Sequence, residues 1–406
     1  MQQHAPSSSR VSVDTLPRPA IRALASSRIR EVANAAMGDP DVLPFWFGEP
    51  DLVTPQPIRD AAVRALAEGD TFYHQNLGIP ALRESIASYV SGLHGPIDID
   101  RIAVTSSGVH GLMLVHQALV DPGSRVVIVT PVWPNLTEGP RILGADVVRV
   151  PLSPTVSGWR LDLDRLLAAL TSDTRALVIN SPNNPTGWVI EAAAQRTILA
   201  HCRRHGIWIV ADDVYERVSY TSNVASSFLA IADSEDRVIS VNSFSKSWLM
   251  TGWRLGWIVA PAPLIAELPK LIEYNTSCAP GFVQQAGIEA IRRTGDVVPA
   301  MQARMLEARD HLYRLLQMLP EVEVTVPPGA MYLFFRVKGV RDSLALAKHL
   351  VANAKIGLAP GIAFGAEGEG FLRWCFAAST ERLSEGVMRL KRGIRTVDRG
   401  EIKWEK

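Results

Sequence analysis

Lys246 and the hydroxyl and guanidinium groups near it are the residues whose types and spacing best suit covalent chemistry. Ser243 and Ser245 stand just before this lysine in the segment VNSFSKSWLMTGWRLGW, and Arg254 follows it by eight residues. A buried lysine of lowered pKa can form a Schiff base with an aldehyde, and nearby hydroxyls with an arginine can bind an anion. A lone lysine near a strand end is usually solvated, so other segments must support this interpretation.

The elements that would position these residues alternate between short β-rich runs and helical patterns. We expect strands at residues 102–106, 125–130, 176–180, 207–211, 237–241 and 255–260. This alternation predicts an α/β fold with a mainly parallel central sheet flanked by helices, and the apolar runs ALVI and IWIV indicate strands covered on both faces. Ligands of such sheets bind beyond the carboxyl ends of the strands. Polar clusters do follow the strands here: SSG, NSPNNPTG, DDVY and NSFSK.

Composition and charge restrict the classes of function. The 406 residues are 47% hydrophobic, which allows a large core and favours two domains over one. The formal net charge of +1 does not indicate binding to nucleic acid or to an anionic membrane. Cys202, Cys278 and Cys375 lack metal-ligand spacing, and we predict no metal site. The polar first ten residues, with no apolar run of 18, predict a cytoplasmic protein that acts on small molecules.

The motifs of the chain, taken in order, resemble those of the class I and II aminotransferases, the fold type I group of pyridoxal-phosphate enzymes. SFSK with Arg254 in GWRLG is similar to the family's cofactor-lysine signature. The likeness continues through GEPD (48–51), Tyr73 with Gly78 and LRESIA, SSGVHG, PVWP, NNPTG, DDVY, PPGAMYLF and FLRWCFA. So many motifs in the same order are not expected to arise by chance. The resemblance implies a pyridoxal 5'-phosphate-dependent aminotransferase that moves an amino group from an L-amino acid to a 2-oxo acid.

The resemblance also implies a role for each matched residue around the cofactor. Lys246 would form the Schiff base and move the substrate proton, and Asp212, rather than the adjacent Asp213, would keep the pyridine nitrogen protonated. Tyr215, also catalytic, and Asn184 would hydrogen-bond the ring oxygen. Trp133 would stack on the ring. The phosphate would bind at a helix N-terminus and in a clamp of side chains, formed by Ser107, Gly108, Val109, Ser243, Ser245 and Arg254.

The resemblance assigns the substrate side of the site as well. Arg373 would bind the α-carboxylate with the help of Gly48 and Asn184, and an arginine inside an apolar strand is costly unless it is paired. Tyr73 would reach the phosphate of a neighbouring subunit, which implies a homodimer with active sites at the interface. Simpler explanations exist for single residues, such as local packing of Tyr73 or helix capping by Asp212.

One position departs from the family pattern. Bacterial aspartate aminotransferases of this subgroup commonly carry a lysine as the third residue of the phosphate turn, where this chain has Val109. Arg28, His74 and His110 are candidates to replace that cation, although each is more often a surface or packing residue. A pocket with valine there favours neutral or aromatic amino acids over aspartate.

The fold does not determine the reaction, because the same scaffold hosts β-lyases, racemases, decarboxylases and cyclases. A regulator that binds the cofactor without turnover needs a DNA-binding helix, and the stretch before Gly48 is too short for one. A homologue with a dead site would not be expected to keep Lys246, Asp212, Arg254 and Arg373 together.

We expect a second, smaller α+β domain after about residue 299, where a long helical stretch begins. The predicted division is a flexible N-terminus (1–15), a segment packing with the small domain (16–47), a large pyridoxal-phosphate-binding domain (48–299), a small C-terminal domain (300–395) and a tail (396–406).

Overall fold

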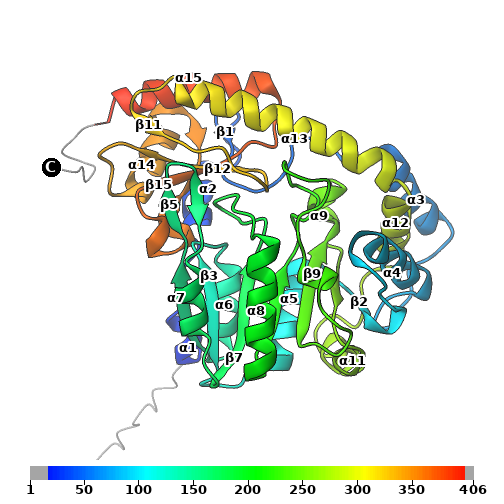
Figure 1. Ribbon diagram of the computed structural model, residues 1–406. Helices are drawn as coiled ribbons and strands as arrows, with labels where there is room; N and C mark the ends of the chain where they lie inside the picture. Colours follow the sequence, from blue (N-terminus) through cyan, green and yellow to red (C-terminus); the bar gives the residue numbers. More distant parts are fainter. Residues whose placement is uncertain (1–16, 398–406) are drawn as a thin grey trace, which may run out of the picture.

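A seven-stranded sheet forms the centre of the protein in the computed structural model, which describes residues 17–397 (Figure 1). Its strand order is β2 (Ile102–Thr105), β10 (Gly256–Val259), β9 (Val238–Ser243), β8 (Trp208–Asp212), β7 (Thr174–Asn180), β3 (Arg125–Thr130) and β4 (Asp146–Pro151). Only β10 runs antiparallel to its neighbours, so the expected mainly parallel sheet is confirmed. The six expected strands are all present, with ends shifted by at most two residues.

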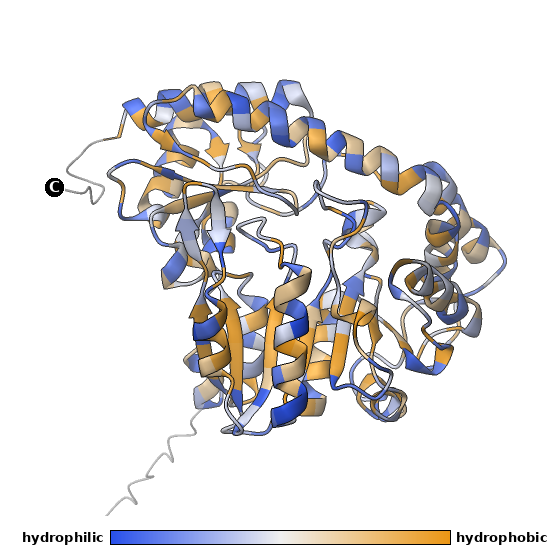
Figure 2. Cartoon of the chain, viewed as in Figure 1, coloured by the Kyte–Doolittle hydropathy of each residue, from blue (hydrophilic) through white to orange (hydrophobic). Residues whose placement is uncertain are grey.

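The strands are buried on both faces because their apolar residues point alternately to two separate cores. Val127 and Leu177 face one core, whereas Val126 and Val178 face the other. Helix α8 (Ala192–His205) covers the first face and α5 (Gly108–Leu119) the second, and Figure 2 shows the strands between them as the most apolar part of the large unit. The runs ALVI and IWIV therefore lack the alternation of a half-exposed sheet.

The edge strand β4 was not predicted from the sequence. Its residues DVVRVP are half-buried and are interrupted by Arg149, and the strand pairs only with β3. An edge strand with a polar interruption has no continuous apolar run to identify it.

A smaller α+β unit lies above the carboxyl ends of the large sheet in Figure 1, as expected. Its sheet has the order β11 (Val322–Glu323), β12 (Tyr332–Val337), β15 (Phe371–Cys375) and β14 (Ala359–Pro360). Helix α14 (Ser343–His349) packs against β14 and β15, and Gly386 of α15 (Thr380–Arg395) packs against Trp374 of β15. The long helix α13 (Thr294–Gln317) contacts elements of both units. The proposed boundary at 299 and 300 falls inside this helix.

The N-terminal segment joins the small unit through strand pairing. β1 (Leu43–Pro44) pairs in parallel with β13 (Ile356–Gly357), and α2 (Arg28–Asn34) contacts α14 and β14. These contacts support the proposed packing of residues 16–47 with the small domain. The predicted flexible N-terminus (1–15) and nearly all of the predicted tail (396–406) lie outside the described residues.

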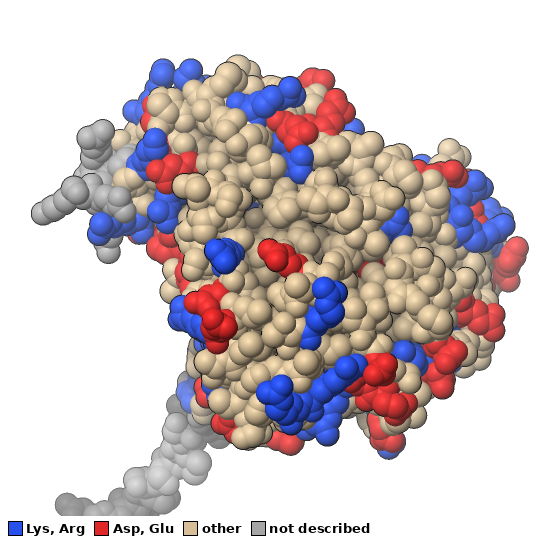
Figure 3. All heavy atoms as spheres, in the orientation of Figure 1, with Lys and Arg blue, Asp and Glu red and all other residues tan. Residues whose placement is uncertain are grey.

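The remaining elements surround these two sheets. They are α1 (Pro19–Arg22), α3 (Gln56–Ala67), α4 (Pro80–His94), α6 (Asn135–Ile142), the hairpin β5 (Ser153–Thr155) and β6 (Gly158–Arg160), α7 (Leu163–Ala169), α9 (Phe244–Ser247), α10 (Ala262–Ile265), α11 (Leu268–Glu273) and α12 (Gly281–Arg292). Acidic and basic side chains are interspersed over the face in Figure 3, in line with the small net charge. Within residues 17–397, no helix has the length and apolar character needed to cross a membrane.

Candidate functional site

A cavity of about 190 Å³, here called the inner cavity, lies where the carboxyl ends of β7, β8 and β9 meet the small unit. It brings together ten residues singled out from the sequence: Gly48, Gly108, Val109, Trp133, Asn184, Asp212, Tyr215, Ser243, Lys246 and Arg373. Ile29, Phe47, Leu112, Asn180, Val214 and Tyr332 complete its lining. It adjoins a wider outer cavity of about 1130 Å³, because Lys246, Phe47 and Val109 line both.

Lys246 reaches the inner cavity from α9, the single helical turn that follows β9. Its Nζ donates a hydrogen bond to the carbonyl oxygen of Gly48. Burial lowers the pKa of this amine to about 8, because an apolar surrounding disfavours the charged form. A substantial fraction of the side chain is therefore neutral, and thus nucleophilic, at slightly alkaline pH.

The turn between β2 and α5 has the features of an anion site. Gly108 is the first residue of α5, and Ser107 caps the helix by accepting a hydrogen bond from the amide of His110 at 3.1 Å. A Cβ added to Gly108 would stand 3.2 Å from Cβ of Ser243, so this turn packs closely against the end of β9. Free amides at a helix N-terminus attract negative charge.

Two further groups flank this turn. The hydroxyl of Ser243 donates to that of Ser245 at 2.8 Å. Arg254 lines the outer cavity and donates to the carbonyl of Thr251 at 2.6 Å, and within residues 17–397 it has no carboxylate partner. Burial lowers the pKa of this guanidinium from its ordinary high value. This exposed guanidinium, with no carboxylate partner in the described chain, is available to bind an anionic ligand.

Asp212 ends β8 and borders the inner cavity, whereas Asp213 does not. An Oδ1 atom of Asp212 accepts a hydrogen bond from the amide of Val214 at 3.3 Å. Burial raises the pKa of this carboxyl to about 7. A cation placed against it would restore the ionised form.

Asp213 belongs to a different buried network. Its carboxylate accepts hydrogen bonds from the hydroxyls of Ser240 (2.6 Å) and Ser227 (3.1 Å). Nearby, Glu216 bonds to His94 at 2.8 Å and accepts from Asn242 at 2.7 Å. The two neighbouring aspartates therefore have different environments: Asp212 borders the inner cavity, and Asp213 belongs to a buried hydrogen-bond network.

Arg373 enters the inner cavity from β15 of the small sheet. Its guanidinium donates to Oδ1 of Asn184 at 2.9 Å and to the carbonyl of Trp46, and it lies 4.5 Å from the ring centroid of Tyr332. Its Nε is buried without a hydrogen-bond partner, and residues 17–397 supply no carboxylate for it. A buried arginine in this state favours a ligand carboxylate, which it can bind in a two-pronged manner.

Tyr332 is a site residue that was not predicted from the sequence. Its hydroxyl lies 2.5 Å from that of Tyr215, and a Cβ added to Gly48 would come within 1.9 Å of it. Only glycine can therefore occupy position 48 without displacing this tyrosine. Tyr332 lies in the motif PPGAMYLF, and this motif is the sequence feature from which it could have been predicted. Ile29 and Phe47 were missed as well, and no motif marked them.

Other predicted residues lie outside the inner cavity. Ser107 and Ser245 adjoin it through the contacts described above. Tyr73 is 86% exposed and lines neither cavity. The candidates for a distal cation are already engaged: Arg28 pairs with Glu31 at 2.7 Å, His74 with Asp70 at 2.6 Å, and Nδ1 of His110 accepts from the amide of Ser106 at 3.2 Å.

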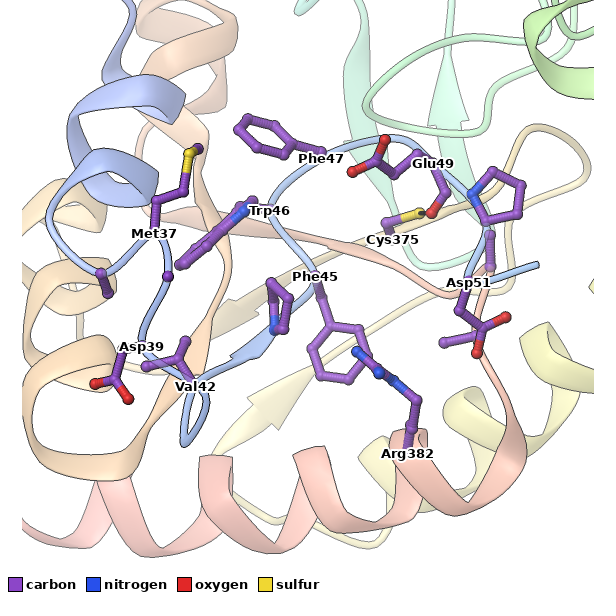
Figure 4. Close-up of a pocket in the computed structure, with 16 residues that line it drawn as sticks. Met37, Asp39, Val42, Phe45, Trp46, Phe47, Glu49, Asp51, Cys375 and Arg382 are labelled. Atoms are coloured by element: carbon purple, nitrogen blue, oxygen red, sulfur yellow. Dashed lines mark hydrogen bonds between the residues drawn. The ribbon is translucent and has the colours of Figure 1, made fainter. Parts of the chain in front are cut away.

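A third hollow, of about 510 Å³, adjoins residues 45–49 (Figure 4). Phe45 and Trp46 line it, Cys375 borders it, and Arg382 rises from α15 beside Phe45. Lys246, Asp212 and Arg373 do not line this space. The convergence of reactive groups is therefore specific to the inner cavity.

A family model described as aminotransferase class I and II matches residues 40–390. The chain belongs to this aminotransferase family. It is 36% identical over 372 residues to an aspartate aminotransferase of Pyrococcus horikoshii, which covers 91% of this chain and 94% of the relative. An aromatic-amino-acid aminotransferase of Thermococcus litoralis is 32% identical over 377 residues, with 91% and 96% covered.

Solved structures agree with this assignment. A mutant of the Thermus thermophilus aspartate aminotransferase superposes with a TM-score of 0.87 at 30% identity, covering 93% of this chain and 99% of that one. The aminotransferase described here thus has the fold type I architecture. Members of the family depend on pyridoxal phosphate, and the chain is a transaminase of that group.

Proposed function

We propose that this aminotransferase holds pyridoxal phosphate on Lys246 and transfers the amino group of a neutral or aromatic L-amino acid to a 2-oxo acid. The supporting observation is the convergence of Lys246, Asp212 and Arg373 on one cavity from three separate elements. Lys246 supplies an amine for the cofactor aldehyde, and Asp212 supplies a carboxylate for the ring nitrogen. Arg373, which has no carboxylate partner in the described chain, supplies a cation for the substrate α-carboxylate.

The residues present fit the cofactor at three points. The amides at the start of α5, the Ser243 and Ser245 hydroxyls and Arg254 suit a phosphate. Asp212, whose carboxyl pKa is raised by burial, suits a protonated ring nitrogen. Trp133 and Asn184 line the same cavity as Asp212. Bound pyridoxal phosphate supplies an electron-withdrawing ring that stabilises negative charge at the substrate Cα.

The chain's own groups then have distinct tasks. Arg373 binds the α-carboxylate with Asn184 at its side, and so fixes the Cα–H bond relative to Lys246. The neutral amine of Lys246 removes the proton from Cα and returns it, a task for which a pKa near 8 is well matched. Tyr215, held by Tyr332, donates toward the ring oxygen.

The preference for neutral donors rests on the lining of the inner cavity. Beyond Lys246 and Arg373 it contains no cation, and all its lining residues are described. Val109 and Leu112 stand at the start of α5, and Ile29 and Phe47 face the same space. A side-chain carboxylate placed there would lose hydration without gaining a partner, which costs on the order of several kcal/mol.

We therefore expect phenylalanine and leucine to exceed aspartate as donors by at least roughly tenfold in kcat/KM. Val109→Lys should raise kcat/KM for aspartate and lower that for phenylalanine, because it adds the missing cation and removes apolar surface. Val109→Met is the matched control, since it adds length without charge and should not help aspartate. Formation of the donor's 2-oxo acid, equimolar with the aminated acceptor, is the measurement. A wild-type preference for aspartate would contradict the proposed donor class, and release of ammonia instead would indicate a lyase.

We also propose a homodimer in which Tyr73 meets the partner's cofactor phosphate. Phe72 and Tyr73 are 81% and 86% exposed, and Tyr274 on the neighbouring loop is 91% exposed. Asn76 ties the two loops together through a hydrogen bond to the carbonyl of Ser277 at 2.8 Å. Three exposed aromatic rings on adjacent loops favour burial by another chain. Sedimentation equilibrium of the holoenzyme tests this, and a monomer at micromolar concentration would refute it. The cytoplasmic location stays a prediction.

A further inference from the structure

Tyr215 and Tyr332 form a pair of tyrosines whose hydroxyl oxygens lie 2.5 Å apart at the wall of the inner cavity. Tyr215 follows β8 of the large sheet, whereas Tyr332 is the first residue of β12 in the small sheet. Their rings meet edge to face with centroids 5.7 Å apart, and both side chains are buried. Within residues 17–397, neither hydroxyl has a second hydrogen-bond partner. Each hydroxyl therefore has capacity left for a ligand in the cavity.

Both hydroxyls of this pair keep their protons over the pH range in which enzymes work. Burial raises the pKa of Tyr332, and it raises the pKa of Tyr215 well above its ordinary value, because an apolar surrounding disfavours a phenolate. The charged groups and the thiol near the pair are Asp212, Lys246, Arg373 and Cys375. The two hydroxyls share one hydrogen bond, so one of the two protons remains for a third group.

The direction of the shared hydrogen bond follows from the task proposed for Tyr215. If Tyr215 donates its proton to the cofactor ring oxygen, it cannot donate the same proton to Tyr332. The proton between the two hydroxyl oxygens must then come from Tyr332. A hydroxyl that accepts a hydrogen bond is polarised into a stronger donor, and a low local dielectric enhances this effect. Tyr332 would thus both orient the hydroxyl of Tyr215 and strengthen it as a donor.

Packing fixes Tyr332 from two sides. The guanidinium carbon of Arg373 lies 4.5 Å from the ring centroid of Tyr332 and 4.9 Å from that of Phe364. The hydroxyl of Tyr332 lies against Gly48, where an added Cβ would overlap it. Gly48 in turn accepts the hydrogen bond from Lys246. The ring and the hydroxyl of Tyr332 therefore have separate contacts, and removing the oxygen alone leaves the ring against the arginine.

We propose that Tyr332 is a positioning residue whose hydroxyl donates to Tyr215 and thereby sets how readily the Lys246 nitrogen, once joined to the cofactor, gives up its proton. This inference rests on the proposed function and deepens it. That nitrogen shares its proton with the ring oxygen of the cofactor. When the proton leaves, the ring oxygen loses this internal hydrogen bond and depends more on Tyr215. A stronger Tyr215 donor therefore favours loss of the proton and lowers the pH at which it occurs.

The test follows the visible absorbance of the holoenzyme as a function of pH. Tyr332→Phe removes the hydroxyl and keeps the ring, so the midpoint of the titration should rise by about 0.3 to 1 pH unit, the size of one neutral hydrogen bond. Tyr220→Phe is the matched control. It removes another buried hydroxyl, which donates to the carbonyl of Ala330 at 2.7 Å and lines neither cavity, and it should leave the midpoint unchanged.

A second replacement changes the acidity of the hydroxyl and nearly preserves its volume. Replacing Tyr332 with 3-fluorotyrosine makes the phenol a stronger donor, so the midpoint should fall where Tyr332→Phe makes it rise. This opposite shift tests the inference even if Tyr332→Phe does not fold. A merely structural role of the hydroxyl would not reverse the sign of the shift.

A double variant shows whether Tyr332 acts through Tyr215. In Tyr215→Phe the ring oxygen has already lost its donor, so adding Tyr332→Phe should move the midpoint no further. The affinity of the holoenzyme for 3-phenylpropionate should stay nearly the same in Tyr332→Phe, because the ring against Arg373 is retained.

An unchanged midpoint in Tyr332→Phe, or a full shift that persists in the Tyr215→Phe background, would overturn the inference even if transamination is normal. A holoenzyme that forms no 2-oxo acid from any neutral donor would instead contradict the proposed function, whatever the titration shows.

Discussion

Lys246→Ala is expected to abolish transamination, with kcat reduced by on the order of 10⁴-fold or more, because the variant loses both the covalent attachment and the proton carrier. The fold should survive, since alanine removes a partly charged amine from a buried position. Single-turnover kinetics with phenylalanine measure the loss, and circular dichroism checks the fold.

A control variant and a mapping experiment test whether the loss of activity in Lys246→Ala is specific to this lysine. Lys270→Ala removes an exposed lysine paired with Glu267 and should leave kcat unchanged. Borohydride reduction of the wild-type holoenzyme, followed by peptide mapping, should place the cofactor on the peptide that contains Lys246. A label found only on another lysine would falsify the assignment.

Asp212→Asn is expected to lower kcat by roughly 10²- to 10³-fold, which is typical for the loss of one preorganised electrostatic group. The amide occupies the same space but has no charge to keep the ring nitrogen protonated. Because this interaction matters most as negative charge develops at Cα, KM should change little. Steady-state kinetics with phenylalanine and 2-oxoglutarate provide the measurement.

Asp213→Asn is the matched control for this prediction. It disturbs the hydrogen bonds from Ser240 and Ser227, so its expected effect is a loss of about 1–3 kcal/mol in stability with a nearly normal kcat. If Asp213→Asn lost activity and Asp212→Asn kept it, the two carboxylates would have to exchange roles.

The central sheet could be predicted from the sequence because buried parallel strands leave continuous apolar runs, as in β7 and β8. Their carboxyl ends share one edge, so the polar residues that follow them were expected to meet there. β4 was missed, since an edge strand with an arginine in its middle lacks that run. The two-residue strands β1 and β13 depend on pairing across more than 300 residues, and neither carries a local signal.

The site was predictable where a residue follows a strand or stands in a motif, as Lys246, Asp212 and Asn184 do. Ile29 and Phe47 reach it through the packing of the N-terminal segment against the small unit. The short helix α2 shows nothing in its own sequence to distinguish Arg30 from Arg28. Their difference arises from three-dimensional neighbours, a carboxylate for one and an aromatic ring for the other.

The opposite surroundings of Asp212 and Asp213 limit how the gene can change in length. Consecutive residues of an extended chain point to opposite sides, so inserting or deleting one residue in β8 would turn each aspartate to the opposite side of the strand. β8 is hydrogen-bonded to β7 and β9 on both sides and cannot absorb the change by slipping. Tolerated length variation is therefore expected at the other end of the strand, in the turn around Gly206 that connects it to α8.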